Sequence, residues 1–217
     1  MDRRCRRIFV RRAPDSRGGF TLIEMLAVML ILSLLVTFLV TQLGRSDDTA
    51  KERLTRTRLL EISAVIDAFE RREGDYPASA FNAEQGSLPN ALNIGGEALV
   101  VALFSKGRGG MGLDADGLDN LDGDQSTKPV SDLPTNDLFE IVDLWGNSIA
   151  YFHHADYGRA DRYQTMDLDT GELVESEVRA FGNPKTRQPF QQGRYQLISA
   201  GVDGRFGTED DITHFKR

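Results

Sequence analysis

The chain has 217 residues, 40% of them hydrophobic, and carries 26 Lys and Arg against 33 Asp and Glu for a net charge of −7. This length suits one globular domain with a short appendage, and the acidic balance argues against a nucleic-acid partner. The single cysteine excludes an internal disulfide and a cysteine-rich zinc site. The charge is unevenly distributed: residues 1–19 hold seven Arg and two Asp (+5), so the remainder carries −12.

An uncharged apolar segment follows the basic N-terminus. Met25 to Leu43 are 19 residues without a charge. As a helix they span roughly 28 Å, close to the ~30 Å hydrocarbon core of a membrane. The alternatives are a buried helix of a soluble protein and a cleaved secretory signal. Buried helices rarely stay uncharged on every face, and no small-x-small cleavage site follows this segment. The preceding arginines predict a cytoplasmic N-terminus, with the bulk of the chain outside.

The junction between the basic and apolar segments carries a motif, RGGFTLIEML at residues 17–26. It resembles the N-terminal signature of type IV prepilins and of the pseudopilins of type II secretion systems. The resemblance implies that a membrane-embedded prepilin peptidase cuts between Gly19 and Phe20 and that Phe20 is then N-methylated. Residues 1–19 would be a leader peptide, and residues 20–44 a transmembrane and assembly helix.

Glu24 is the only ionisable side chain between Arg17 and Arg45. A carboxylate in an apolar segment is costly unless it has a partner, so Glu24 is a candidate functional residue. A helix N-terminus offers free N–H groups and a positive dipole end. The resemblance implies that Glu24 meets the Phe20 amine of a neighbouring subunit and sets the filament register. The alternative is a carboxylate that reaches the membrane interface without a partner role.

A helical pattern continues beyond the apolar segment. Apolar residues recur at three- and four-residue steps at Leu54, Leu59, Ile62, Val65, Ile66 and Phe69. Gly74 and Pro77 predict that the helix ends near residue 73. The sequence therefore predicts one helix of about 54 residues that starts at Phe20, with Gly44 as the point where it can bend.

The rest of the chain predicts a head of short elements. We expect a short helix over 97–104, a long loop over 105–137, strands over 138–142, 148–153 and 195–199, and a hairpin over 161–181. Several short antiparallel strands against one long helix make an α+β, pilin-like fold, with the helix packed on one small antiparallel sheet. The head would comprise residues 45–217, including the amphipathic helix 45–73. Trp145 and Tyr151 are expected in its core.

The head also resembles the major pseudopilins of type II secretion systems. The shared residues are Asp-x-Trp-Gly-Asn at 143–147, then Tyr151, then Leu-x-Ser-x-Gly-x-Asp-Gly and a closing Asp-Asp-Ile over 197–212. Leu144 and Ser148 stand where that family usually has proline.

Acidic residues gather among glycines near the C-terminus, at Asp203, Glu209, Asp210 and Asp211. Calcium takes six to eight oxygen ligands, and glycine lets a backbone fold around the ion. The resemblance implies a structural calcium held by Asp203, Asp210 and Asp211, and the alternative is a solvated acidic turn. A second acidic run at 114–124 could hold calcium as well. It lacks the spacing of an EF-hand, and we expect it to be an exposed charged loop.

No motif for nucleophilic, metal-dependent or phosphate chemistry stands out, so we expect a structural subunit of a pilin-like filament and not an enzyme. The resemblance implies the major pseudopilin of a type II secretion-like system, which polymerises to drive protein export. Its partners would be other pseudopilins, the prepilin peptidase and an inner-membrane assembly platform. It would span the bacterial inner membrane once, with its head in the periplasm. The alternatives are a type IV pilin for adhesion, motility or DNA uptake, a membrane-tethered calcium- or ligand-binding domain, and a secreted enzyme with an unusual leader.

Overall fold

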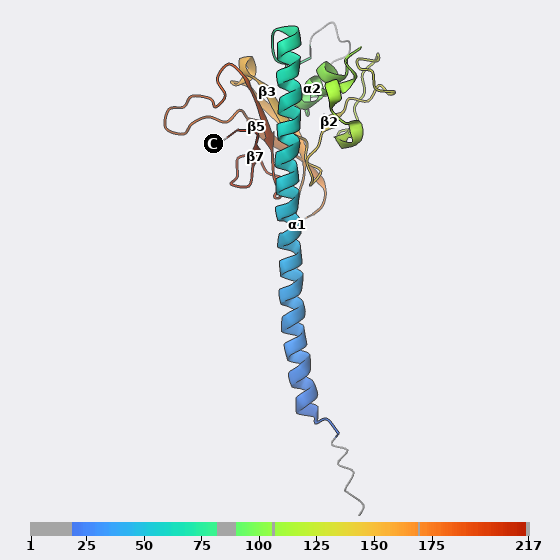
Figure 1. The fold of residues 1–217 in the computed structure, drawn as a ribbon, viewed down its shortest axis with the longest axis vertical. Coiled ribbons are helices and arrows are strands. Elements are labelled where there is room, and N and C mark those ends of the chain that lie inside the picture. Colours follow the sequence, from blue (N-terminus) through green and yellow to red (C-terminus); the bar gives the residue numbers. More distant parts are fainter. Residues whose placement is uncertain (1–18, 82–89, 106, 169, 216–217) are drawn as a thin grey trace, which may run out of the picture. The chain divides into compact units, whose positions relative to one another are not determined.

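The computed structural model describes residues 19–81, 90–105, 107–168 and 170–215. The main elements are α1 (Leu22–Glu73), α2 (Ile94–Phe104), β1 (Leu118–Asp119), β2 (Glu140–Ile141), β3 (Ala150–His153), β4 (Ala160–Met166), β5 (Leu173–Arg179), β6 (Tyr195–Ser199) and β7 (Ile212–Thr213) (Figure 1). The chain divides into two compact units, Met1–Arg45 and Ser46–Arg217. The predicted leader lies outside the described residues apart from Gly19.

Helix α1 begins at Leu22 and ends at Glu73, within two residues of its predicted bounds. Gly44, where the sequence allows a bend, lies within α1. At its C-terminal end, Gly74 adopts a φ of 89°, a left-handed conformation that glycine takes without strain. Its N–H donates to the Glu70 carbonyl at 2.8 Å. Gly74 therefore ends the helix at the predicted place.

The N-terminal part of α1 is apolar on all sides. Leu22–Val40 is the one helical segment in the described ranges that is long and apolar enough to cross a membrane, and none of it is buried within the chain. Exposed fractions of its large side chains run from 82% at Leu22 to 47% at Val28. Exposure of so much apolar surface to water costs about 25 cal/mol per Å². This segment is therefore stable in lipid or against other apolar helices, and not in water.

One face of α1 is buried between Thr55 and Phe69. Its buried side chains follow four- and three-residue steps, at Thr55, Leu59, Ile62, Ile66 and Phe69. The prediction that Leu54 belongs to this face is wrong, because Leu54 is 56% exposed. Thr55 takes its place, and its hydroxyl accepts a hydrogen bond from the Leu144 N–H at 3.3 Å. A hydrophobic pattern does not detect such a residue, because a distant hydrogen-bond donor justifies its burial.

The antiparallel sheet β3-β6-β7 is the middle layer of the head. Tyr151 of β3 lies opposite Leu197 of β6, and both pack into the core with the buried face of α1. Phe152 and Ile198 point to the other side, where they pack against Tyr163 of the β4–β5 hairpin. Because successive strand residues point to opposite faces, this short sheet has a buried core on each side.

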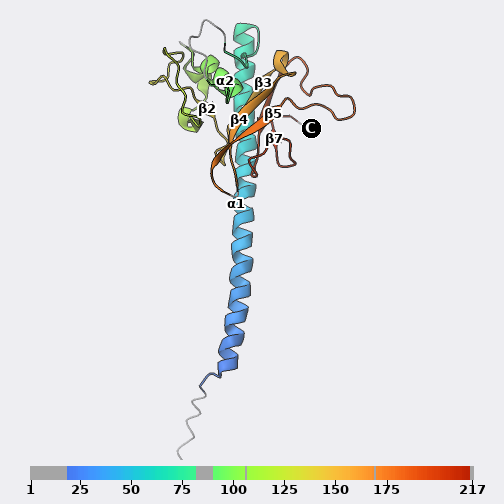
Figure 2. The same cartoon turned by 180° about the vertical axis from the view of Figure 1, so that it is seen from behind.

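Helix α2 and the hairpins complete the head. Helix α2 is buried on nearly every side and contacts β2, β3 and β4. Gly95 in its first turn lies so close to the Tyr151 carbonyl and the Tyr163 hydroxyl that a Cβ would overlap both. In both views, α2 and β2 lie to one side of residues 46–73 of α1, and β5 and β7 lie to the other (Figure 1 and Figure 2).

The predicted α+β class is confirmed, and β3, β6 and the β4–β5 hairpin lie in their predicted segments. Three details differ from prediction. The described strands form three small antiparallel sheets and not one. The expected loop 105–137 contains β1, which pairs with β2. The C-terminal loop returns through β7, which pairs with β6. Strands of two residues are too short to show an alternating pattern, so only tertiary pairing identifies them.

Candidate functional site

Glu24 closes the first turn of α1. Its Oε2 atom accepts hydrogen bonds from the backbone N–H and from the hydroxyl of Thr21, both at 2.8 Å. The Thr21 hydroxyl in turn accepts from the Glu24 N–H at 3.3 Å. This reciprocal pair is a capping box. The prediction for Glu24 omits this partner, although Thr-x-x-Glu before an apolar helix is its sequence signature.

The N-terminal site residues are all accessible. Phe20 is 78% exposed, and Glu24 is exposed as well. Of the two oxygens of the Glu24 carboxylate, only Oε2 accepts hydrogen bonds from described residues. A Cβ at Gly19 would meet nothing within 4 Å. The fold of the described chain therefore gives no reason for a glycine at position 19.

Asp143 connects the Asp-x-Trp-Gly-Asn turn at 143–147 to the C-terminal motif at 197–212 through hydrogen bonds. Its Oδ1 atom accepts from the N–H groups of Trp145 and Asn147, each at 2.9 Å, which closes the turn. Its Oδ2 atom accepts from the Ser199 hydroxyl at 2.7 Å and from the Asn147 amide at 3.1 Å. The same Asn147 amide donates to the Gly201 carbonyl at 2.8 Å. The turn and the start of the C-terminal loop are therefore held together by one buried carboxylate and one amide.

These donors offset part of the cost of burying Asp143. Asp143 is 5% exposed. Burial raises the pKa of its carboxyl, and the hydrogen bonds from Ser199, Asn147 and Trp145 oppose that shift. The turn also contacts α1, because the Trp145 indole N–H donates to Asp48 at 3.3 Å. Tyr151 is fully buried and Trp145 packs partly buried against the same core, so both are core residues as predicted.

The predicted calcium residues lie in one loop, but their carboxylates do not form a single set. Asp210 Oδ2 accepts from the Asp203 N–H, and Asp211 Oδ2 accepts from the Gly207 N–H, both at 2.9 Å. Asp203 Oδ1 accepts from the Arg205 N–H at 2.8 Å. In the described chain, oxygens of the three aspartates do not all come within 4.8 Å of one another. The loop is organised by carboxylate-to-backbone hydrogen bonds.

A hollow of about 240 Å³ lies between this loop and α1. It is lined by Trp145, Val202, Glu209, Asp210 and Asp211 together with Asp48, Thr49, Glu52 and Arg56 of α1. Gly201 has a φ of 68°, and a Cβ there would overlap the Asp210 backbone. Arg56 is the one base among these lining residues, and it pairs with Glu52 at 3.2 Å. The hollow is therefore strongly acidic.

Two comparisons bear on the identity of the chain. The family model of the prokaryotic N-terminal methylation motif matches residues 15–40. Type II secretion system core protein G of Escherichia coli strain K12 is 24% identical over 205 residues, which cover 94% of each chain. The chain therefore has the N-terminal motif and the α+β fold of a pilin-like protein. No solved structure gives a significant match.

The match to the methylation motif confirms the resemblance found at residues 17–26 of this pilin-like protein. Gly19, Phe20 and Glu24 all lie inside the matched segment. The similarity to core protein G continues through the head, which contains the motifs that Asp143 and Asn147 join.

The pilin-like head also contains two groups of ligand atoms that the sequence does not predict. In each, three potential ligand atoms lie within 4.8 Å of one another; the groups are Asp75, His153 and His154, and Glu97, Asp122 and Glu140. In the first group, the His153 Nε2 atom lies 3.4 Å from Asp75 Oδ1. In the second group, two of the three carboxylates are fully buried. Neither group forms a contiguous sequence motif. In the first, Asp75 is far in the sequence from the adjacent His153 and His154, and in the second the three carboxylates come from three segments.

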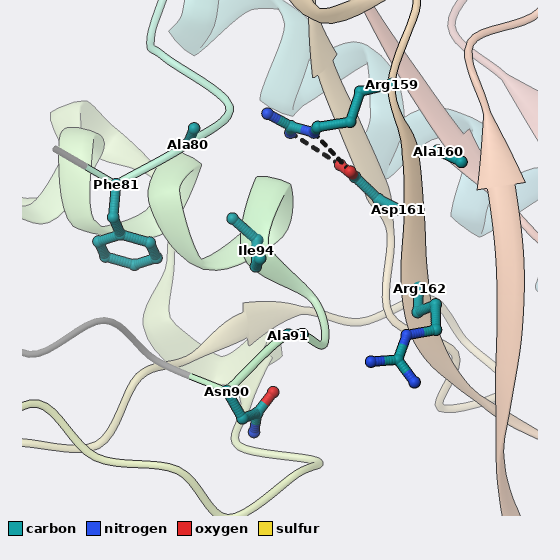
Figure 3. Close-up of a pocket in the computed structure, with 9 residues that line it drawn as sticks. All are labelled: Ala80, Phe81, Asn90, Ala91, Ile94, Arg159, Ala160, Asp161 and Arg162. Carbon is teal, nitrogen blue, oxygen red and sulfur yellow. Dashed lines mark hydrogen bonds and ion pairs between the residues drawn. The ribbon is translucent and has the colours of Figure 1, made fainter.

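A pocket of about 480 Å³ opens beside β4 (Figure 3). It is lined by Ala80, Phe81, Asn90, Ala91, Ile94, Arg159, Ala160, Asp161 and Arg162. Its charged side chains are already paired, since Arg159 contacts Asp161 at 2.5 Å and Arg162 contacts Glu175 at 2.7 Å. Among its described lining residues, the pocket therefore offers no unpaired charge to a ligand.

Proposed function

We propose that this pilin-like protein is the major pseudopilin of a type II secretion-like system, a structural subunit whose polymerisation drives protein export. The main support is the similarity to core protein G, which extends over 94% of both chains and includes the head. The methylation motif and the exposed apolar segment Leu22–Val40 add to it. The proposal assigns no catalytic step to the chain.

Processing comes first in this proposal. A prepilin peptidase removes residues 1–19, and the new amine of Phe20 is methylated. The open surroundings of Gly19 and the exposure of Phe20 suit a bond that an external protease must reach. The arginines before the apolar segment keep the N-terminus in the cytoplasm, which leaves the head in the periplasm of a bacterium and the chain anchored in its inner membrane.

Assembly depends on the apolar segment. Leu22–Val40 exchanges lipid for the same segment of other subunits, and this exchange is nearly neutral for apolar surface. Packing and polar contacts therefore decide the register of the filament. Glu24 pairs with the Phe20 amine of a neighbouring subunit through a charge-assisted hydrogen bond. Partners in this process are further pseudopilins and an inner-membrane assembly platform.

Mass spectrometry of the mature N-terminus tests the processing step. We expect the chain purified from membranes to begin at N-methylated Phe20, and a Gly19→Arg variant to keep residues 1–19. A mature chain that starts beyond residue 44 would lack the assembly segment and would rule out every filament role.

Deletion of the gene in its host distinguishes the pseudopilin proposal from the type IV pilin alternative. We expect the deletion strain to retain proteins that it normally exports, and the intact gene to restore their export. Loss of surface pili, adhesion, motility or DNA uptake with export unchanged would replace the pseudopilin proposal by the type IV pilin.

We propose further that the C-terminal loop binds one structural calcium ion through Asp203, Asp210 and Asp211. These carboxylates suit a hard cation, and Asp210 and Asp211 line an acidic hollow that has no unpaired base among its described residues. Gly201 admits the close approach of the Asp210 backbone that a side chain would prevent. The ion would neutralise the loop and fix it beside the Asp143 turn.

Removal of calcium should lower the melting temperature of the protein by about 5–10 °C, because saturation at a hundredfold excess over Kd adds about 2.7 kcal/mol. Trp145 is the single tryptophan and lines the same hollow, so its fluorescence should respond to calcium. Asp211→Asn should abolish that response, whereas the exposed Glu172→Gln should retain it. A wild-type protein without any response in melting or fluorescence would refute the calcium proposal.

A further inference from the structure

Three carboxylates meet beside the first turn of α2, and a fourth lies near them. Glu97 comes from α2, Glu140 from β2, and Asp122 and Asp124 from the segment that follows β1. One oxygen each of Glu97, Asp122 and Glu140 lies within 4.8 Å of the others. Glu97 and Glu140 are 0% exposed, while Asp122 is only partly buried. We call these four residues the Glu97 cluster.

Glu97 lacks a hydrogen-bond donor. Neither of its buried carboxylate oxygens accepts a hydrogen bond from a donor in the described chain. The group that faces it is the Glu140 carboxylate, and two carboxylates bond to each other only when one carries a proton. Buried polar groups nearly always have a partner, and a buried charge without one is costly. Glu97 therefore requires a partner that these residues do not supply.

The neighbouring carboxylates are held in place by neutral groups. Glu140 accepts from the Asn93 amide at 2.9 Å and from the Leu121 N–H at 3.1 Å. Asp122 accepts from the Asn90 amide at 2.9 Å. No base in the described ranges forms an ion pair with the cluster. These contacts orient the carboxylates without neutralising them.

The segment after β1 contributes two further buried oxygens that have no hydrogen-bond donor in the described chain. Asp124 Oδ1 and Asn120 Oδ1 are both buried without a donor in the described chain. The amide nitrogen of Asn120 donates to the Asp124 carbonyl at 2.8 Å, so the two residues lie together. Gly123 between the aspartates has a φ of 71°, which turns the chain back toward α2. The expectation that 114–124 is simply an exposed loop is therefore wrong for its second half.

The energetics favour a bound positive charge. Burial raises the pKa of Glu97 to about 10, with the charges of Asp124 and Glu140 adding to the shift. Burial also raises the pKa of Glu140 to about 8. Buried carboxylates with no base beside them must take up either protons or a cation. A divalent ion neutralises two charges at once and also supplies the missing partner of Glu97.

We propose that Glu97, Asp122 and Glu140 bind a hard divalent cation of the calcium class, with Asp124 completing the set. The donors are all carboxylate oxygens, which suit calcium or magnesium and not a metal that prefers thiolate or imidazole. Oxygens up to 4.8 Å apart fit around an ion whose ligands lie at about 2.4 Å. The ion would fasten the first turn of α2 to β2 and to the acidic segment. This site is separate from the C-terminal loop and does not depend on the proposed function.

Equilibrium dialysis of the full chain in detergent with calcium tests the site by counting bound ions. Glu97→Gln keeps the shape of the side chain and removes its charge, and we expect it to bind one ion fewer per chain than the wild type. Asp116→Asn is the matched control, because Asp116 is an exposed acid of the same run outside the cluster. An unchanged count in Glu97→Gln would overturn the proposal in favour of a proton shared with Glu140.

Two further variants keep the result interpretable. If Glu97→Gln does not fold, as judged by Trp145 emission, the partly buried Asp122→Asn decides by the same count. Asp211→Asn reports the C-terminal loop. If both sites bind, the wild type holds two ions, each single variant one, and the double variant none. If only the Glu97 cluster binds, the wild type holds one ion, which is lost in Glu97→Gln and kept in Asp211→Asn. A wild type that binds no calcium refutes both sites.

Discussion

Glu24→Gln is expected to leave the chain inserted and cleaved but to abolish its assembly into filaments. Glutamine can serve at the third position of a capping box, so the hydrogen bonds from Thr21 have an acceptor in the variant. The negative charge is lost, and with it the proposed charge-assisted bond to the Phe20 amine of a neighbouring subunit. The measurement is the yield of cross-linked filaments, together with mass spectrometry to show that Phe20 is still the mature N-terminus.

Thr21→Val is the matched control for the Glu24 variant. It removes the capping hydroxyl and keeps the carboxylate, at a cost of about 1 kcal/mol to the start of the helix. We expect this variant to assemble. Normal filaments from Glu24→Gln combined with a defect in Thr21→Val would show that Glu24 serves only the helix cap, and the proposed register contact would then be wrong.

Asp143→Ala is expected to lower the unfolding free energy of the head by about 3 kcal/mol. The substitution leaves two backbone N–H groups, the Asn147 amide and the Ser199 hydroxyl without their acceptor in a buried turn. Burial of the carboxylate itself raises its pKa, and removal of that desolvation cost offsets part of the loss. The measurement is urea unfolding of the full chain in detergent, followed by the fluorescence of Trp145.

Two milder variants give a scale for the loss of unfolding free energy in Asp143→Ala. Ser199→Ala deletes one donor and should cost about 1 kcal/mol. Glu177→Ala removes an exposed ion pair with Arg179 and should change the stability by less than about 0.5 kcal/mol. All three are compared with calcium removed, so that a change in metal binding does not enter. An Asp143→Ala protein within 1 kcal/mol of the wild type would show that water replaces the carboxylate, and that the turn does not depend on it.

Features encoded in contiguous residues were predictable. The apolar segment, the methylation motif around Gly19 and Phe20, and the end of α1 at Glu73 each depend on a short run of residues or on one helical period. The β4–β5 hairpin is similar, because its strands are adjacent in the chain and meet at a turn with a glycine. Local backbone preferences determine such elements before any distant contact forms.

Tertiary structure decided how buried polar groups find partners. Thr55 replaces Leu54 in the core because Leu144, 89 positions away, supplies a donor. Asp143 meets Ser199 from a separation of 56 positions, and neither residue has a period or spacing that predicts the bond. The Glu97 cluster is the extreme case, since α2, β2 and the segment after β1 each contribute a carboxylate. A hydrophobic pattern identifies which residues avoid water, whereas the partner of a buried charge is determined only when the folded chain brings distant segments together.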